Sequence, residues 1–330
     1  MTKKTQATIT AFGAYLPEKV LTNRDLEKMV ETSDEWIVTR TGIQERRIAN
    51  EDEYTSTMAT KSAQDALQKA HVDPSQIDAI LVATMTPDYF CPSTAAIVQH
   101  AIGAHNACAL DIQAACTGFL YGLSIAKAWV ESGAFKNVLV IASEKNSAFT
   151  DYQDRNTCVI FADGSGACLV QGNGSGYAIG SVSLGADGGE AALLGVPAGG
   201  SRKPATSDTV ISREHYIKMN GKELFKHAVR RMETSAKECL DAAGIPEEAI
   251  NWLVPHQANI RIIEAIAKRF NISWDRVVKT IHKFGNTSSA TIPISIADLE
   301  REHEIQTGDT LLLTAFGGGL TWGSALLTKV

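Results

Sequence analysis

Short apolar runs alternate with longer amphipathic stretches along the chain, and this alternation predicts an α/β protein. The apolar runs are typical of buried strands, and they occur at Ala7–Phe12, Ala79–Ala83, Ala107–Asp111, Val138–Ser143, Ala167–Gln171, Trp252–Pro255 and Thr310–Ala315. The stretches with helical spacing occur at Thr55–Ala70, Gly118–Glu131, Gly221–Ala243 and Ile260–Phe270. The segment Gly185–Asp208 is rich in Gly, Ser and Pro and is predicted to be mostly loop.

The order of patterns in the first half of the chain recurs in the second half. Residues 77–82 match 250–254, and residues 137–142 match 310–315 at nearly the same offset. A small-residue strand closes each half, at 164–167 and at 323–325. Chance similarity is an alternative, because α/β segments share Val, Ile, Leu and Gly. We nevertheless predict a duplication, with similar halves at residues 1–175 and 176–330.

The composition is that of a globular protein, with 44% hydrophobic and 21% charged residues in a chain of 330. No segment has the roughly 20 consecutive apolar residues that cross a bilayer, and the start of the chain lacks the apolar region of a secretory signal. We therefore expect a cytoplasmic protein that does not bind membranes. The net charge of −6, from 37 acidic and 31 basic residues, gives no general reason to bind nucleic acid.

Six cysteines are spread along the chain without a C-x-x-C pair or a zinc-like spacing with histidines, so no metal site is predicted. In a reducing compartment they should be free thiols. Cys116 has a distinctive setting, because a strand ends near Asp111 and a helix begins just after the cysteine. Free N–H groups and the helix dipole favour a thiolate at such a position, so we expect a lowered pKa. On position alone, a buried structural cysteine is an equal alternative.

Two polar residues lie where the chain leads into predicted helices. His256 directly follows an apolar strand, and Asn286 lies in a polar loop. Ligands collect at such places in α/β proteins, although a single loop histidine or asparagine is usually structural. Together, their N–H groups suit the stabilisation of an enolate formed when a malonyl thioester loses carbon dioxide. The run Gly317–Gly319 can present further backbone donors or can form only a tight turn.

Taken together, six segments closely resemble the β-ketoacyl-[acyl carrier protein] synthase III family of condensing enzymes. They are WIVTRTGI at 36–43, ACTG at 115–118, FADG at 161–164, VPHQAN at 254–259, GNTS at 285–288 and FGGG at 316–319. The resemblance covers essentially the whole chain. It implies the thiolase fold, in which two duplicated α/β halves stack as five αβαβα layers. It also implies a homodimer that needs no metal or other cofactor.

The resemblance further implies an activity and its residues. The enzyme would initiate fatty acid biosynthesis by condensing a short acyl-CoA primer, acetyl-CoA or a somewhat longer or branched one, with malonyl carrier protein. Cys116 would carry the acyl group, and His256 and Asn286 would promote decarboxylation. The backbone N–H groups of Cys116 and Gly318 would form the oxyanion hole.

The same resemblance implies two sets of binding residues. The coenzyme A contacts carry over to Thr32, Trp36, Arg40 and Arg155. The acyl carrier protein contacts carry over to Arg261 first, and then to Lys226, Lys268 and Arg269. The alternatives are an ordinary surface cation–π contact for Trp36 and Arg40, and solvated helix faces for the basic residues.

The primer pocket departs from the family pattern at one position. In several members a bulky aromatic residue precedes the Pro-Ser pair that Pro92 and Ser93 match here, and it limits the pocket from across the dimer. Cys91 occupies that position in this chain, with Phe90 before it. Primers longer or more branched than acetyl are therefore predicted. Further candidates for the pocket lining are Leu193, Leu194, Val196 and Phe316.

Other activities on this scaffold are alternatives. They include transfer of a starter acyl group in specialised metabolism, a Cys-His thioesterase, and a non-catalytic carrier-binding protein. A thiolase proper would need a second catalytic cysteine near the C-terminus, whereas the last cysteine is Cys239. Plant-type polyketide synthases are typically longer and lack these flanking motifs. The retained Asn286 favours decarboxylative condensation, while primer preference and metabolic context stay open.

Overall fold

A computed structural model describes residues 5–330 of the chain. Within these residues the strands form one nine-stranded sheet and two small two-stranded sheets. The strands are β1 (Ala7–Tyr15), β2 (Val20–Thr22), β3 (Glu45–Arg47), β4 (Ala79–Ala83), β5 (Cys108–Ile112), β6 (Asn137–Lys145), β7 (Asp163–Gly172), β8 (Tyr177–Ala186), β9 (Leu194–Gly195), β10 (Lys218–Met219), β11 (Trp252–Pro255), β12 (Thr310–Gly317) and β13 (Thr321–Lys329). The helices are α1 (Asn23–Leu26), α2 (Asp34–Thr41), α3 (Thr55–Ala70), α4 (Thr94–Ile102), α5 (Gly118–Ser132), α6 (Arg155–Cys158), α7 (Ser207–Ile211), α8 (Gly221–Ala243), α9 (Ile260–Arg269), α10 (Ile281–Phe284) and α11 (Thr291–Glu302).

The large sheet, in the order β11-β12-β13-β8-β1-β7-β6-β4-β5, has two parts with corresponding pairings. In the first part β4 is parallel to β6, which is antiparallel to β7, which is antiparallel to β1. In the second part β11, β12, β13 and β8 repeat these relations in the same order. The parts meet where β1 pairs with β8. The division of the chain at residue 175 stays a prediction.

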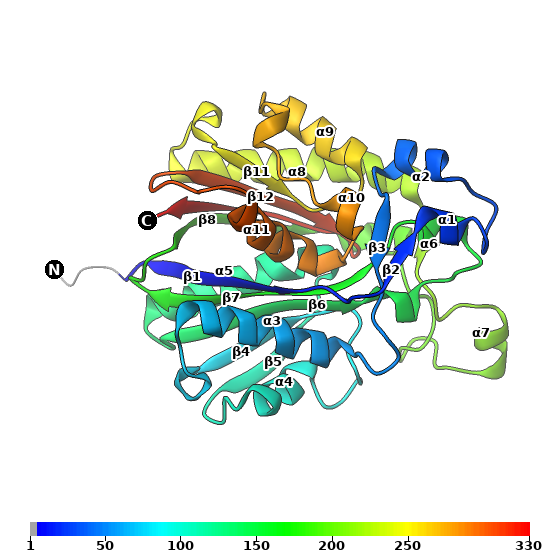
Figure 1. Cartoon of the computed structure of the whole chain (residues 1–330), viewed down its shortest axis with the longest axis horizontal. Coiled ribbons are helices and arrows are strands. Elements are labelled where there is room, and N and C mark those ends of the chain that lie inside the picture. Colours follow the sequence, from blue (N-terminus) through cyan, green and yellow to red (C-terminus); the bar gives the residue numbers. More distant parts are fainter. Residues whose placement is uncertain (1–4) are drawn as a thin grey trace.

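Helices and strands are stacked in five layers, and three hydrophobic clusters fill the spaces between these layers (Figure 1). The central cluster contains α5 and α11 together with inward-facing residues of both parts of the sheet. One outer cluster joins α3 and α4 to the first part, and the other joins α8 and α9 to the second part. The alternation of the strands allows this, because Val138 and Val140 of β6 face the centre while Leu139 and Ile141 face outward. The predicted five-layer α/β architecture is confirmed.

Local sequence explains why several elements begin and end where they do. The side chain of Asn220 caps α8 by accepting a hydrogen bond from the N–H of Glu223, and the helix ends at Gly244, whose φ of 65° lies in the left-handed region. β4 is an apolar run buried along its whole length between two parallel neighbours. The predicted bounds of α3, α8, β4 and β11 agree with the structure, and α9 ends one residue before its predicted end.

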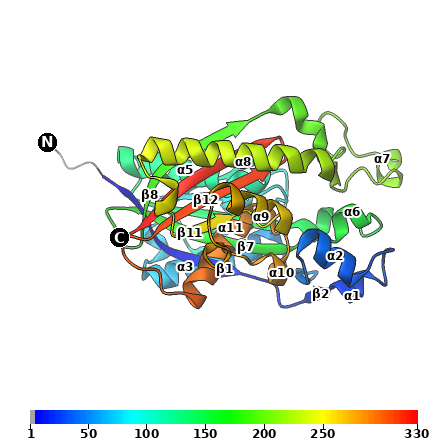
Figure 2. The same cartoon turned by 90° about the horizontal axis from the view of Figure 1, so that it is seen from above.

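The structure contains more regular elements than the sequence pattern predicted. The stretch predicted as loop contains the end of β8, a 3₁₀ turn at Gly188–Leu193, β9 and the first residues of α7. The helices α2 and α4 were also not among the predicted elements, and α11 was expected after the Asn286 loop without predicted bounds. Figures 1 and 2 place α1, α2, α6 and α7 at the end of the molecule opposite the two termini. No helix in the described part of the chain is long and apolar enough to cross a membrane.

Candidate active site

Cys116 lies in a short turn at the start of a central helix. The 3₁₀ turn Ala115–Thr117 leads into α5, and Ala115 has a φ of 46°, which is unusual for a residue with a side chain. Cys116 is buried, with 7% of its surface exposed. The end of β12 approaches it closely, because a Cβ atom added to Gly317 would lie 2.7 Å from the backbone nitrogen of Cys116. Only glycine fits at this position.

The expected lowering of the Cys116 pKa is wrong for this structure. Burial raises the pKa of the thiol to about 12, and the nearby carboxylate of Glu144 adds to this increase. A hydrogen bond from the Ser288 hydroxyl to Sγ, at 3.6 Å, lowers it in part. The helix N-terminus was identified correctly, but the sequence pattern gave no measure of how completely the sulfur is removed from water.

His256 follows β11 immediately, as predicted, and its side chain is buried. The buried side chain of the next residue, Gln257, donates to the carbonyl of Pro255 and to that of Val278, which joins this segment to a distant part of the chain. Nδ1 of His256 lies 2.7 Å from the hydroxyl oxygen of Thr291. Burial lowers the pKa of His256 to about 3, so the imidazole is neutral at ordinary pH.

Asn286 lies beside the Phe161 segment and precedes a second short turn. Its Oδ1 accepts a 2.8 Å hydrogen bond from the N–H of Ser288, which fixes the orientation of the amide and leaves Nδ2 as its donor side. The following 3₁₀ turn Ser288–Ala290 leads into α11, and Ser288 has a φ of 54°. The hydroxyl of this serine is the donor that contacts Cys116.

Two cavities meet at Cys116. A narrow cavity of about 120 Å³ is lined by Cys116, His256 and Asn286 together with apolar side chains. The structure therefore brings all three predicted catalytic side chains to one space, although they come from distant parts of the chain. A wider cleft of about 1020 Å³ reaches Cys116 from another direction, and Gly318 lies in its lining. Cys116 therefore lines both cavities, which suits a group that receives an acyl chain and then delivers it.

Two of the residues predicted to bind coenzyme A lie beside the indole of a third, Trp36. The guanidinium carbons of Arg40 and Arg155 lie 5.8 Å and 5.1 Å from the centre of the Trp36 ring. The hydroxyl oxygen of Thr32 is buried and has no hydrogen-bond partner among residues 5–330. Asn259, which lines the narrow cavity, donates to the backbone carbonyl of Arg40 at 2.9 Å. This contact ties the Trp36 helix to the mouth of the cavity.

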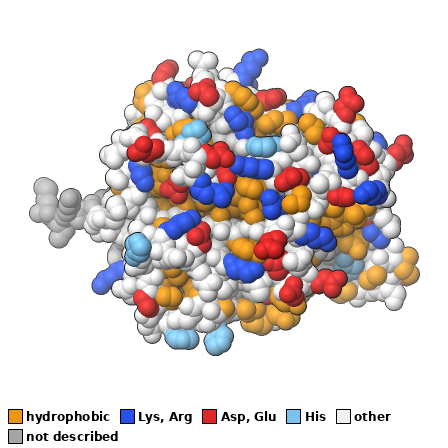
Figure 3. Space-filling model, in the orientation of Figure 1, with side chains coloured by type: hydrophobic (Ala, Val, Ile, Leu, Met, Phe, Trp, Pro, Cys, Tyr) orange, Lys and Arg blue, Asp and Glu red, His pale blue; other side chains and the backbone are white. Residues whose placement is uncertain are grey.

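The predicted carrier-binding cations are all exposed on α8 and α9 but differ in their partners. The guanidinium of Arg261 lies 5.6 Å from the ring centre of Phe225, which lines the narrow cavity. Lys226 and Arg269 form ion pairs with Glu223 and Glu233. Basic and acidic side chains are interspersed over the face shown in Figure 3. Arg261 is therefore the cation most directly associated with the cavity mouth.

Most of the predicted primer-pocket residues line one or both of the two cavities, and Leu193 lines neither. Cys91 and Phe90 line the wide cleft, and Phe90 is 91% exposed. Phe316 lines the narrow cavity instead. Leu194 lines both cavities, whereas Leu193 packs against the outer cluster of α8 and α9.

Sequence reasoning did not single out Ser288, Thr291 or Glu144. Ser288 donates to Cys116, and Thr291 contacts His256. Glu144 is fully buried beside the turn that precedes α11. The sequence feature that could have identified Glu144 is its position among polar residues, Ser143–Lys145, at the end of an apolar strand. The two hydroxyl residues lay within or just beyond the recognised GNTS segment.

Models of one protein family match most of the functional segments. The model described as 3-oxoacyl-[acyl-carrier-protein (ACP)] synthase III matches residues 110–188, and the model of its C-terminal part matches residues 240–329. Cys116 lies in the first matched range, and His256 and Asn286 lie in the second.

Individual relatives match the chain over its full length. The β-ketoacyl-[acyl-carrier-protein] synthase III of Chlamydia trachomatis is 56% identical over 326 residues, which are 98% of this chain and 100% of that protein. The protein of the same name from Caldanaerobacter subterraneus is 50% identical over 99% of both chains. The crystal structure of 3-oxoacyl-[acyl-carrier-protein] synthase III from Aquifex aeolicus has a TM-score of 0.90 and 46% identity, and the match covers 98% of this chain and 99% of that one.

Proposed function

The chain belongs to the β-ketoacyl-[acyl carrier protein] synthase III family, and from this premise we propose how its residues perform the family reaction. The enzyme has the thiolase fold and condenses an acyl-CoA primer with malonyl carrier protein, which initiates fatty acid synthesis. The observation that carries the assignment of roles is that Cys116, His256 and Asn286 line one narrow cavity.

The first half-reaction uses Cys116. The sulfur attacks the thioester carbonyl of the primer, a new carbon–sulfur bond forms, and coenzyme A leaves as its thiol after taking up a proton. The backbone N–H groups of Cys116 and Gly318 are the proposed donors to the oxyanion. The hydroxyl of Ser288 donates to the sulfur, and this bond strengthens when the thiolate forms because it becomes charge-assisted.

The second half-reaction uses His256 and Asn286. Loss of carbon dioxide from the malonyl group leaves an enolate, whose carbon attacks the acyl group on Cys116. The carbon–sulfur bond breaks, and the released thiolate takes up a proton from solvent. Neutral N–H donors at the enolate oxygen stabilise its charge without losing a proton. Since burial keeps the pKa of His256 near 3, the imidazole is neutral and suited to this task.

We propose that Thr291 sets which imidazole nitrogen carries the proton. Its hydroxyl oxygen lies 2.7 Å from Nδ1 of His256 and 3.1 Å from the carbonyl oxygen of Ser288. In the proposed arrangement the hydroxyl donates to Nδ1, and the imidazole proton is on Nε2. His256 then directs an N–H donor away from Thr291 and toward the substrate.

The substrates would enter along the narrow cavity. We assign the adenine of coenzyme A to Trp36, with Arg155 and Arg40 beside the ring and its phosphates. We assign the docking of acyl carrier protein to Arg261 at the cavity mouth, with Lys268, Lys226 and Arg269 behind it. The attraction to an acidic carrier would weaken as salt concentration rises.

The wide cleft supports two further proposals. Cys91 lines this cleft and is smaller than the aromatic residue that several family members have at the position, so we propose that primers longer or more branched than acetyl are accepted. We also propose a homodimer, because β5 is at the edge of the sheet and Phe90 and Tyr89, 91% and 62% exposed, form an apolar surface beside the cleft. The enzyme would act in the cytoplasm and without a prosthetic group.

The direct test offers the enzyme malonyl carrier protein and acyl-CoA primers of two to eight carbons. Intact-mass spectrometry follows the products, with Cys116→Ser and Asn286→Ala alongside. A 3-ketoacyl carrier product that disappears in Cys116→Ser and is strongly reduced in Asn286→Ala is expected. Acylation of the wild-type cysteine without any ketoacyl product would contradict the condensing function and favour starter transfer or hydrolysis.

A further inference from the structure

Glu144 lies near the end of β6, is 0% exposed, and has no part in the reaction steps above. Its Oε1 accepts a 2.7 Å hydrogen bond from the hydroxyl of Ser289. Its Oε2 accepts hydrogen bonds from the hydroxyls of Thr84 and Thr86, at 3.2 Å and 2.9 Å, and from the N–H of Met85 at 3.1 Å. The carboxylate therefore joins β6, the segment after β4, and the turn before α11.

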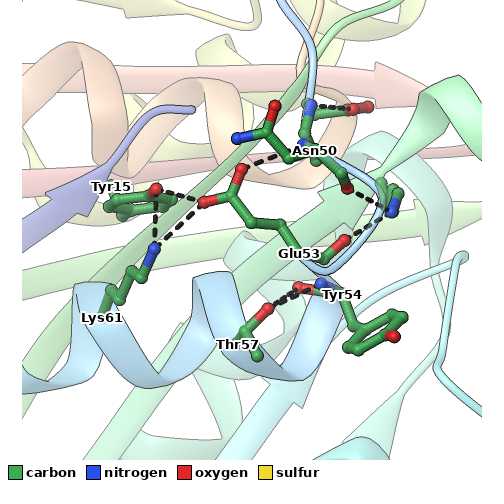
Figure 4. A network of polar contacts seen from close by, with 9 residues as sticks. Tyr15, Asn50, Glu53, Tyr54, Thr57 and Lys61 are labelled. Carbon is green, nitrogen blue, oxygen red and sulfur yellow. Dashed lines mark hydrogen bonds and ion pairs between the residues drawn. The ribbon is translucent and has the colours of Figure 1, made fainter. Parts of the chain in front are cut away.

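A second glutamate shows how different this environment is. Glu53 also links separate segments, but its partners are the phenol of Tyr15, the ammonium of Lys61 at 3.0 Å and the N–H of Asn50 (Figure 4). The hydrogen-bond donors to Glu144 within residues 5–330 are all neutral. Burial raises the pKa of Glu144 against their influence. A carboxyl group buried without a cation is costly, and such groups are concentrated at functional sites.

The hydrogen bond between Ser289 and Glu144 holds the turn that carries the catalytic hydrogen-bond donors. Ser289 follows Ser288, whose N–H orients the amide of Asn286 at 2.8 Å and whose hydroxyl lies 3.6 Å from Sγ of Cys116. The φ of 54° at Ser288 is unfavourable for a residue with a side chain, so the turn needs support from its surroundings. The bond from Ser289 to Glu144 provides that support.

This link persists whether or not Glu144 is protonated. Ser289 has one hydroxyl hydrogen and two acceptors, Oε1 of Glu144 at 2.7 Å and the carbonyl of Ala83 at 3.3 Å. An ionised Glu144 accepts that hydrogen. A neutral Glu144 donates its own proton to Ser289, which then donates to Ala83. The turn is held in both states.

We propose that Glu144 is a positioning residue for the condensation step, which holds the turn Ser288–Ala290 and the donors of Asn286 and Ser288 against Cys116. It acts through Ser289 and does not contact the substrate. The inference rests on the proposed function, because only a condensing enzyme uses the Asn286 donor in a second half-reaction that is separate from acylation of Cys116.

The test compares Ser289→Ala and Glu144→Gln with the control Glu53→Gln. Ser289→Ala removes the link while leaving three donors to Glu144, and Glu144→Gln is the conservative variant that can still bond Ser289 through its amide. Acylation of Cys116 by acyl-CoA is timed by intact mass, and condensation of the acylated enzyme with malonyl carrier protein is measured as kcat and KM. Thermal melting reports the folded state of each variant.

We expect Ser289→Ala to lower kcat for condensation by about tenfold or more, with KM within about twofold of wild type. The acylation rate should fall by a smaller factor, because the Ser288 hydroxyl contacts the sulfur in both half-reactions whereas the Asn286 donor acts only in the second. Glu144→Gln should fall less, and Glu53→Gln should stay within about twofold. Equal losses in acylation and condensation, accompanied by a lower melting temperature, would reduce Glu144 to a structural role and overturn the inference. Unchanged condensation in Ser289→Ala would also overturn it. If the wild type forms no ketoacyl product, the proposed function itself fails.

Discussion

The turns before the two central helices share a backbone form and differ in chemistry. Each is a 3₁₀ turn that begins at or beside a residue with positive φ, 46° at Ala115 and 54° at Ser288, and each leads into a helix of the central layer. The first presents a thiol. The second presents a hydroxyl and orients an amide. In both turns the backbone therefore determines the position of the functional group, and the side chain determines its chemistry.

The surroundings of the two turns differ as well. Burial is the largest influence on the pKa of Cys116 and raises it, so the nucleophile rests as a thiol. The second turn carries hydroxyl groups at Ser288 and Ser289, and Thr291 adds a third at the start of α11, each with a hydrogen-bond partner. One turn supplies a reactive atom and the other supplies the donors that act around it. The following predictions test this division of roles between the two turns.

The largest effect is expected at the first turn. Cys116→Ser replaces the only proposed acyl carrier, so acylation and condensation should both fall by at least about 10³-fold. Intact mass after incubation with acyl-CoA measures acylation, and formation of the ketoacyl product measures condensation. Residual acyl transfer at another residue of the variant would break the assignment.

A smaller and more selective effect is expected from the second turn. Asn286→Ala removes an enolate donor, so condensation should fall by about 10²–10³-fold, the typical cost of one such group. Acylation of Cys116 should continue at close to the wild-type rate. A variant that loses acylation to the same extent would show that the two turns do not divide the reaction as described.

The pH dependence of stability should report separately on His256 and Cys116, because burial shifts their pKa values in opposite directions. The folded pKa of His256, about 3, lies below its ordinary 6.5, so the unfolded state binds more protons and stability falls as pH drops below 6.5. The folded pKa of Cys116, about 12, lies above its ordinary 9.0, so stability falls as pH rises above 9.0. Each of these two groups should contribute a slope of up to about 1.4 kcal/mol per pH unit.

Denaturant unfolding across the pH range measures both limbs. His256→Asn should flatten the acid limb only, and Cys116→Ser should flatten the alkaline limb only. Many carboxylates also titrate at low pH, so the comparison of each variant with wild type is the informative quantity. An unchanged acid limb in His256→Asn would mean that the histidine is not held neutral by burial.

The smallest effect concerns the backbone of the turns. A positive φ costs a residue with a side chain about 1–2 kcal/mol, and glycine avoids this cost but loses more entropy on folding. Ala115→Gly should therefore raise the free energy of unfolding by less than about 1 kcal/mol. Ser288→Gly should gain no more, because it also removes the hydroxyl bonded to Cys116. A clear loss of stability in Ala115→Gly would indicate that the turn is not strained.

Much of the fold could be predicted from periodicity, and the exceptions have physical reasons. α8 has a polar face and clear caps, so its bounds were predicted correctly. α11 contains Pro293 and is buried along residues 291–299, so its apolar pattern did not give the bounds of the helix expected after Asn286. β8 is interrupted by Gly180 and Gly185, and its end was taken for loop.

The catalytic residues could be predicted because they lie in segments shared with a family. Glu144 could not, since its partners Thr84 and Ser289 are far away in sequence and only the fold brings them together. The direction of the Cys116 pKa shift was wrong for a related reason. Position at a helix N-terminus is visible in a sequence, whereas the degree of burial depends on every layer that packs around the sulfur.

The shared central layer has a consequence for synthesis on the ribosome. The first part of the sheet, with α5, is made before β8, α11 and the strands that cover the other side of that layer. At ordinary elongation rates the remaining 150 or so residues take on the order of ten seconds to appear. During that interval the apolar face of α5 lacks its native partners. We expect the nascent chain to depend on chaperones at this stage, even though the completed enzyme buries the whole surface.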